Sequence, residues 1–279
     1  MSRFLSVLVL ALALVAFLPR GSRAASPEGD YPIRSVPFTS VTVDDAFWSP
    51  RLETNRTVTV RYDFQKCERT GRISNFDKAA GLEPGDFEGL FGFNDSDVFK
   101  VIEGASYALS LQPDPELDRY LDDLAVKIAS AQEEDGYLYT VGTIGKLAEE
   151  PACCVSDPRW SDLGSGHELY NLGHFYEAAV AHHQATGKRT LLDVALKSAD
   201  LLTTVFGPGR NMGVPGHQEI EIGLVKLYHA TGEEKYLDLA RFFLDQRGNT
   251  EGHELYGAYS QDHLPVTEQT EAVGHAVRA

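Results

Sequence analysis

Residues 183–195 read HQATGKRTLLDVA and residues 228–240 read YHATGEEKYLDLA, so one pattern occurs twice in this chain. In both copies an Ala-Thr-Gly turn ends one helical stretch, because glycine readily takes the left-handed conformation that closes a helix. A second amphipathic stretch containing a Leu-Asp pair follows each turn. The turn QPDP at 112–115, followed by RYLD at 119–122, is a looser third copy. Repeated helical hairpins stack into a solenoid or close into a toroid.

The repeat predicts three pairs of helices. We expect them at 95–111 with 115–134, at 167–187 with 189–205, and at 216–232 with 234–248. The first helix of each pair is less charged and carries small residues, so we expect it inside, with the second helix outside. The pattern therefore predicts an all-α fold, an (α/α)6 barrel that is incomplete: about three hairpins and the start of a seventh inner helix near Pro265.

The segments outside the hairpins have simpler patterns. Residues 1–24 combine a basic start, an apolar run and a small-residue exit, which is typical of a cleaved signal peptide. Residues 25–46 contain prolines and β-branched residues and are expected to be an extended entry segment. Residues 47–279 form the predicted partial barrel domain, with a helix to about residue 70 and a long ordered loop over 71–94. The rival interpretation of the first segment is an uncleaved membrane anchor.

Composition narrows the range of partners. The formal net charge of −16 argues against nucleic acid, because phosphate binding needs clustered Lys and Arg. Beyond the signal peptide no segment is apolar enough to cross a membrane, so a secreted or periplasmic protein is expected. The three cysteines, Cys67, Cys153 and Cys154, have no C-x-x-C spacing, which favours free thiols or one bridge over a metal site.

The stretch GHELYNLGHFYEA at 166–178 begins like the zinc-protease motif H-E-x-x-H, but Asn171 stands where the second histidine would be. Its ring and acid side chains repeat at helical spacing and share one face; they are His167, Tyr170, His174 and Glu177. Gly-His pairs also place His217 and His275 on the later inner helices, with Glu219 and Glu221 beside His217. Glu103 is a further candidate for the cavity. Asp95 and Asp97 are expected to cap a helix.

Two interpretations of these histidines remain open. A single buried histidine is as often a cross-helix hydrogen-bonding residue as a ligand-binding one. Several histidines at equivalent positions favour a lined cavity, where imidazoles and carboxylates bind hydroxyl groups and aromatic rings cover an apolar sugar face.

Seven motifs follow one another along the chain. They are FWSPRLETNRTVTV (47–60), TGRISNF (70–76), FNDSDVFKVIEGASYAL (93–109), AQEEDGYLYT (131–140), GHELYNLGHFYEAAVAHHQATGKR (166–189), GHQEIEIGLVKLYHATGEEKYLDLARFFLDQRG (216–248) and QDHLPVTEQTEAVGHAVRA (261–279). In this order, from about residue 36 to residue 279, they resemble glycoside hydrolase family 127, the β-L-arabinofuranosidase-like family. The resemblance implies an (α/α)6 barrel followed by β-sandwich domains, and retaining hydrolysis of β-L-arabinofuranosides on plant glycans or glycoproteins. It also implies substrate-contacting roles, carried over motif by motif, for His167, His217, Gln218, Glu219 and His275.

The resemblance further implies a cysteine nucleophile held at a zinc ion, with a glutamate as acid/base. These groups are expected downstream of residue 279, in motifs that this sequence does not contain, and no cysteine follows Cys154. No catalytic or metal-binding residue is therefore assigned, and the chain as given is expected not to hydrolyse an aryl β-L-arabinofuranoside. The alternatives are an epimerase-like (α/α) barrel, in which paired histidines move a proton, and an inactive sugar-binding remnant.

Overall fold

The computed structural model describes residues 35–145 and 155–275, and these residues form helices joined by loops, with an isolated β-bridge between Phe206 and Asn211. The main helices are α1 (Ser49–Thr54), α2 (Val60–Arg69), α3 (Ser74–Ala79), α4 (Asn94–Leu111), α5 (Pro115–Ala131), α6 (Thr140–Ile144), α7 (Glu168–Thr186), α8 (Thr190–Val205), α9 (Ile220–Thr231) and α10 (Glu234–Asp245). None of these helices is both long and apolar enough to cross a bilayer.

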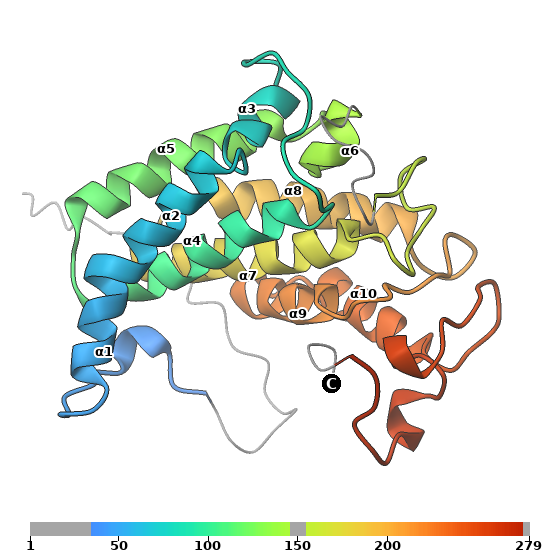
Figure 1. Ribbon diagram of the computed structural model, residues 1–279. Coiled ribbons are helices and arrows are strands. Elements are labelled where there is room, and N and C mark those ends of the chain that lie inside the picture. Colours follow the sequence, from blue (N-terminus) through green and yellow to red (C-terminus); the bar gives the residue numbers. More distant parts are fainter. Residues whose placement is uncertain (1–34, 146–154, 276–279) are drawn as a thin grey trace, which may run out of the picture.

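The six hairpin helices form two layers (Figure 1). In one layer α7 lies between α4 and α9, and in the other α8 lies between α5 and α10. The three inner helices all begin at the right-hand end of the molecule in Figure 1, which gathers their N-termini together. The all-α fold, an incomplete helical toroid with an inner and an outer layer, is confirmed.

Local sequence explains where these helices begin and end. Asp114 accepts a hydrogen bond from the Leu117 amide (3.1 Å), and Pro115 follows at the first helical position of α5. Gly187 and Gly232 end α7 and α9 in the left-handed conformation, at φ 76° and φ 79°. Both Ala-Thr-Gly turns therefore close a helix as the repeat predicts.

Helix α7 is the centre of the core and is buried around most of its surface. Its Phe175 packs against Phe99 of α4, with ring centroids 4.8 Å apart. On its other side, Gly173 and Gly223 allow the backbones of α7 and α9 to touch. A Cβ atom on Gly173 would lie 2.6 Å from the carbonyl carbon of Glu219, so only glycine permits this approach.

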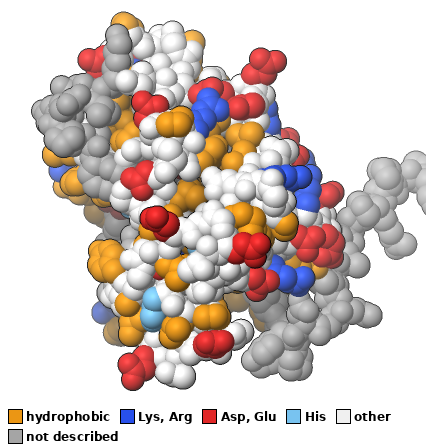
Figure 2. All heavy atoms as spheres, turned by 90° about the vertical axis from the view of Figure 1, so that its right-hand side faces the viewer, with side chains coloured by type: hydrophobic (Ala, Val, Ile, Leu, Met, Phe, Trp, Pro, Cys, Tyr) orange, Lys and Arg blue, Asp and Glu red, His pale blue; other side chains and the backbone are white. Residues whose placement is uncertain are grey.

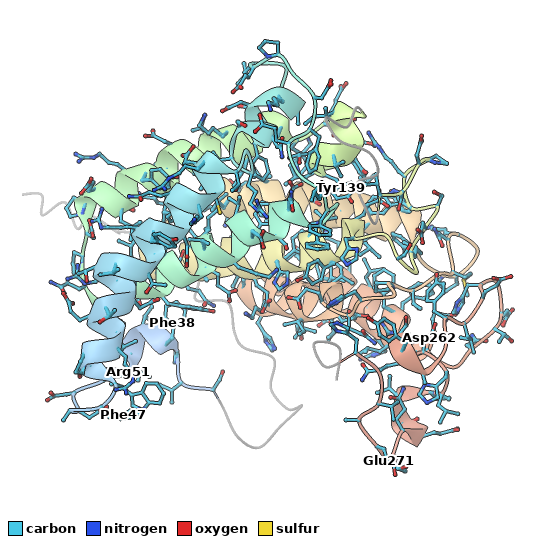
Figure 3. All side chains as sticks on the ribbon, in the orientation of Figure 1. Phe38, Phe47, Arg51, Tyr139, Asp262 and Glu271 are labelled. Atoms are coloured by element: carbon cyan, nitrogen blue, oxygen red, sulfur yellow. The ribbon has the colours of Figure 1, made fainter. Side chains whose placement is uncertain are left out.

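The N-terminal part of the domain agrees with its predicted helix and adds another. Residues 49–69 are helical, with a π-helical turn at Asn55–Thr59 between α1 and α2. The Arg51 guanidinium lies over the Phe47 ring near the start of α1, 3.7 Å from its centroid (Figure 3). The loop predicted over 71–94 contains the short helix α3, because Ile73 and Phe76, three residues apart, both pack into the core.

The expected capping by Asp95 and Asp97 is wrong. The helix predicted over 95–111 begins at Asn94, and neither aspartate caps it. Asp95 is buried and accepts hydrogen bonds from Thr140 N (2.8 Å) and Oγ1 (2.6 Å), while Asp97 pairs with Arg72. Burial raises the pKa of Asp95 to about 6. Both carboxylates thus join α4 to other segments. The spacing of residues within α4 does not reveal these partners.

The seventh helix expected from Pro265 does not form within the described residues. A single 3-10 turn, Val266–Glu268, follows Pro265, and the chain then runs irregularly to His275. Most of this stretch is exposed, and a short helix without a packed face gains too little to offset its nucleation cost. Gly274, at φ 95°, also interrupts the helical geometry.

Candidate functional site

Three histidine rings from distant parts of the sequence meet at the end of the barrel where the inner helices begin. His167 precedes α7, His217 lies in the loop before α9, and His275 lies in the C-terminal segment. The ring centroids of His167 and His217 are 5.8 Å apart, and those of His217 and His275 are 6.1 Å apart. On the surface of this end, acidic side chains are scattered among apolar ones (Figure 2).

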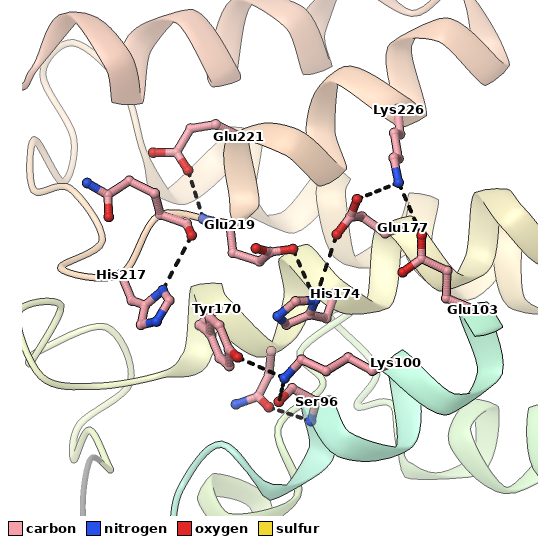
Figure 4. Close-up of polar contacts among 12 residues, drawn as sticks. Ser96, Lys100, Glu103, Tyr170, His174, Glu177, His217, Glu219, Glu221 and Lys226 are labelled. Atoms are coloured by element: carbon pink, nitrogen blue, oxygen red, sulfur yellow. Dashed lines mark hydrogen bonds and ion pairs between the residues drawn. The ribbon is translucent and has the colours of Figure 1, made fainter. Parts of the chain in front are cut away.

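We call His167, Tyr170, His217 and His275 the ring cluster. Tyr170 contacts His167 and His217 within it, and His174 beside it. Its ring lies 4.4 Å from His217, 5.3 Å from His167 and 4.6 Å from His174, measured between centroids. Lys100 of α4 donates a hydrogen bond to the Tyr170 hydroxyl (2.7 Å) (Figure 4). Phe93 covers the other side of His167 at 5.1 Å. The result is a patch of aromatic faces and imidazole nitrogens, which suits a small polyol with both hydroxyl groups and C–H faces.

Asn171 is what replaces the second histidine of the zinc-protease motif. It is fully buried and donates to the carbonyls of Gly92 (3.0 Å) and His167 (2.7 Å). Its side-chain oxygen accepts a hydrogen bond from Ser96 N (2.7 Å). The side chain therefore ties the start of α7 to the start of α4 and holds the backbone of His167 in place.

Glu168, the glutamate of that motif, also has partners with a structural role. It is buried and accepts hydrogen bonds from the Tyr137 hydroxyl (2.7 Å) and the Trp160 amide (2.9 Å). Burial raises its pKa. Trp160 sits at φ 63°, so the carboxylate holds a strained loop residue against α7.

Beyond His174, a polar network crosses the inner helices (Figure 4). His174 Nδ1 lies 3.0 Å from Glu219 Oε1 and 3.7 Å from Glu177 Oε2. The Lys226 ammonium joins Glu177 to Glu103, which lies 3.2 Å from it on α4. The network thus links α4, α7 and α9 through three carboxylates, one ammonium and one imidazole.

The two closest carboxyl groups of this network have opposite protonation tendencies. Burial raises the pKa of Glu219 to about 9, and both the hydrogen bond to Glu177 and the negative charge of Glu177 act in the same direction. The pKa of Glu177 is lowered: hydrogen bonds to Glu219 and Lys226 and the Lys226 charge outweigh its burial. Burial, aided by Lys100, lowers the pKa of His174 to about 3. These opposite pKa shifts favour a proton on Glu219 rather than on Glu177, and they favour a neutral His174 imidazole beside the pair.

His174, Glu177 and Glu219 are also the one group within 35–145 and 155–275 whose donor atoms could surround a metal ion, all lying within 4.8 Å of one another. The Lys226 ammonium already supplies a positive charge to Glu177. A shared proton and an ammonium therefore balance the carboxylates, and we assign no metal to this cluster.

Comparison with known proteins matches residues 40–279 to a family model described as the GH127 catalytic domain of β-L-arabinofuranosidase. This chain belongs to glycoside hydrolase family 127. A family 127 relative, the non-reducing end β-L-arabinofuranosidase of Bifidobacterium longum subsp. longum, is 41% identical over 226 residues. That alignment covers 74% of this chain and 33% of the relative, so the chain spans about a third of the relative's length.

Two solved family 127 structures share the fold. One, a GH127 β-arabinofuranosidase, is 53% identical with a TM-score of 0.81, covering 89% of this chain and 39% of the other. The second, a GH127 β-L-arabinofuranosidase from Geobacillus stearothermophilus T6, is 41% identical with a TM-score of 0.77, covering 85% of this chain and 40% of the other. The resemblance to family 127 inferred from the motifs is confirmed.

The structure places the five predicted substrate-contacting residues differently. His167, His217 and His275 form the ring cluster, whereas Glu219 turns toward His174 and Glu177. Gln218 donates to the Ser260 carbonyl (2.8 Å), and among the described residues its buried Oε1 has no hydrogen-bond partner. Sugar contact by any of these residues stays a prediction. Lys100 is not among the predicted site residues, because a lysine on an inner helix has no motif of its own.

The zinc site implied by the family does not fit the described residues. Cys67 is the cysteine among them, and it is buried between α2 and α4, where burial raises the pKa of its thiol to about 11. Such a thiol remains protonated at neutral pH and is a poor metal ligand. Cys153 and Cys154 lie outside the described residues, so we derive no step through zinc.

Proposed function

We propose that the ring cluster of this family 127 chain binds a terminal β-L-arabinofuranose unit of a plant glycan or glycoprotein. The observation that carries the proposal is the convergence of His167 and His217 on Tyr170, with His275 beside His217. Imidazole nitrogens provide directional hydrogen bonds to hydroxyl groups, and the Tyr170 and Phe93 rings provide apolar faces. The buried Gln218 Oε1 is an acceptor that a sugar hydroxyl can satisfy.

Binding of the sugar and cleavage of its glycosidic bond require different groups. Relatives named β-L-arabinofuranosidases support hydrolysis of β-L-arabinofuranosides as the reaction of the family 127 enzyme. Retention of configuration is implied only by the resemblance to the family. The described residues provide a binding surface, but none of them brings a reactive thiol to it, since the Cys67 thiol is buried in the hydrophobic core and burial raises its pKa to about 11. We therefore expect the 279-residue chain to bind the sugar without turning it over.

Sugar binding is tested with methyl β-L-arabinofuranoside titrated into the purified chain by calorimetry. We expect binding that H167A and H217A each weaken about tenfold, because each removes a hydrogen bond worth about 1 kcal/mol together with ring contact. H229A is the matched control, since His229 is exposed on α9 away from the cluster. Equal affinity in H167A, H217A and H229A, or no binding by the wild-type chain, would contradict the proposal.

The same mixtures distinguish the alternative activity. Chromatography of the sugar after long incubation is expected to return it unchanged. Free L-arabinose would show that the chain hydrolyses the glycoside unaided, and an isomerised sugar that His167 and His217 substitutions abolish would favour the epimerase-like alternative.

Export is proposed from residues 1–24, which lie outside the described residues. The apolar run from Phe4 to Leu18 and the small residues near Ala24 support a cleaved signal. On secretion by a bacterial host, mass spectrometry is expected to show a mature chain beginning near residue 25. Retention of the full N-terminus in the membrane fraction would favour the anchor instead.

A further inference from the structure

Arg247, just beyond the end of α10, is buried to a degree unusual for an arginine, with 2% of its surface exposed. Its guanidinium donates to the carbonyls of Pro215 (3.2 Å) and Ser260 (3.3 Å). It also pairs with the buried carboxylate of Glu221, 3.1 Å away. One side chain therefore binds the loop before α9, the first turn of α9 and the C-terminal segment.

The contacts of Arg247 with Pro215 and Glu221 fix the backbone around His217. Pro215 precedes it by two residues, and the second oxygen of Glu221 accepts a hydrogen bond from the Glu219 amide (3.2 Å). Arg247 and Glu221 thus hold the chain on both sides of His217. The short loop between them has little freedom to move its imidazole.

The contact of Arg247 with Ser260 connects it to the segment that carries His275. Ser260 lies in the turn 257–262, and its carbonyl accepts hydrogen bonds from Arg247 and Gln218. The Asp262 carboxylate (Figure 3) fixes this turn by accepting hydrogen bonds from the amides of Tyr256 and Gly257, both at 2.8 Å. The His275 amide then donates to the carbonyl of Tyr259 (3.2 Å). The segment carrying His275 is therefore docked on the turn that Arg247 holds.

A buried ion pair contributes little net stability, because desolvation of two charges offsets most of their attraction. Its value lies in geometry, since a guanidinium offers several donors in a rigid plane. We propose that Arg247 is a positioning residue that sets the separation of His217 and His275, and through it the affinity for the sugar. This inference rests on the proposed binding of arabinofuranose.

The experiment compares R247K, the charge-neutral pair R247M/E221Q, and the control R241K on the exposed face of α10 in the full chain. Lysine keeps the charge but cannot reach three acceptors at once. The double variant removes both buried charges, while the glutamine that replaces Glu221 can still accept the Glu219 amide. Three quantities are measured: the melting temperature, the affinity for methyl β-L-arabinofuranoside, and the nuclear Overhauser contact between the His217 and His275 rings.

We expect R247K and R247M/E221Q to lose affinity at least tenfold and to lose the ring contact at temperatures well below melting. The double variant is expected to melt near the wild-type temperature, which separates positioning from general stability. R241K is expected to match wild type in all three measurements. A double variant with wild-type affinity and an intact ring contact would overturn the proposal. If the wild-type chain binds no sugar, the proposed function fails, and the ring contact alone decides the positioning role.

Discussion

G173A is expected to unfold with a free energy about 2 kcal/mol below wild type and to lose sugar binding. In a helix interior, alanine in place of glycine gains about 0.5–1 kcal/mol. Here the added Cβ meets the carbonyl carbon of Glu219 at 2.6 Å and its oxygen at 2.7 Å. Backbone atoms cannot rotate away, so α9 must shift, and such overpacking costs about 1–3 kcal/mol or more. The shift moves His217, two residues before Glu219. Urea denaturation and calorimetric titration measure the two effects.

G104A is the matched control for this helix contact. Gly104 lies inside α4, and a Cβ atom there would meet nothing within 4 Å. We expect this variant to be more stable than wild type by about 0.5–1 kcal/mol, with unchanged sugar affinity. Stabilisation by both substitutions would show that α7 and α9 are not in backbone contact.

E219Q is expected to be more stable than wild type at pH 8, by on the order of a few kcal/mol, and nearly equal to it at pH 5. The pKa of Glu219 rises from its ordinary value of 4.5 to about 9 on folding. Between these values the folded state binds more protons than the unfolded chain, so the free energy of unfolding falls as the pH rises. Glutamine keeps the shape and a donor for Glu177 without this proton cost.

The measurement is a set of urea curves from pH 5 to pH 9, read as the difference between E219Q and wild type so that other titrating groups cancel. The control E251Q, at an exposed position, should differ from wild type by a constant amount. A flat difference for E219Q would mean that Glu219 is ionised in the folded protein, contrary to its burial beside Glu177.

The helices of the barrel were largely predictable, because their signals are local. The Ala-Thr-Gly turns, the cap at Asp114 and the small residues on the inner helices are all properties of neighbouring residues. The helix expected near Pro265 does not form in the part of the chain that the structure describes, which shows that a local signal alone is not sufficient. Its local pattern is helical, but its residues have no packed face among the described ones.

The candidate site was predictable only in part. The Gly-His pairs pointed to His167, His217 and His275, and the structure brings these rings together. The turn of Glu219 toward Glu177 depends on the contact at Gly173, which joins α7 to the start of α9, two helices separated in sequence by the whole of α8 and its loops. Asn171 and Arg247 act in the same way, through carbonyl groups supplied by other segments.

The amino-acid order is sufficient to establish the helix pairs, the family and the candidate imidazoles, because periodicity, capping and motif order are read along one chain. Folding in three dimensions decides which carboxyl groups are buried beside each other, which contacts Asn171 makes in place of the second histidine of the protease-like motif, and how the C-terminal segment reaches the ring cluster. These properties depend on burial and on the distance between atoms from remote segments, and sequence spacing contains neither quantity.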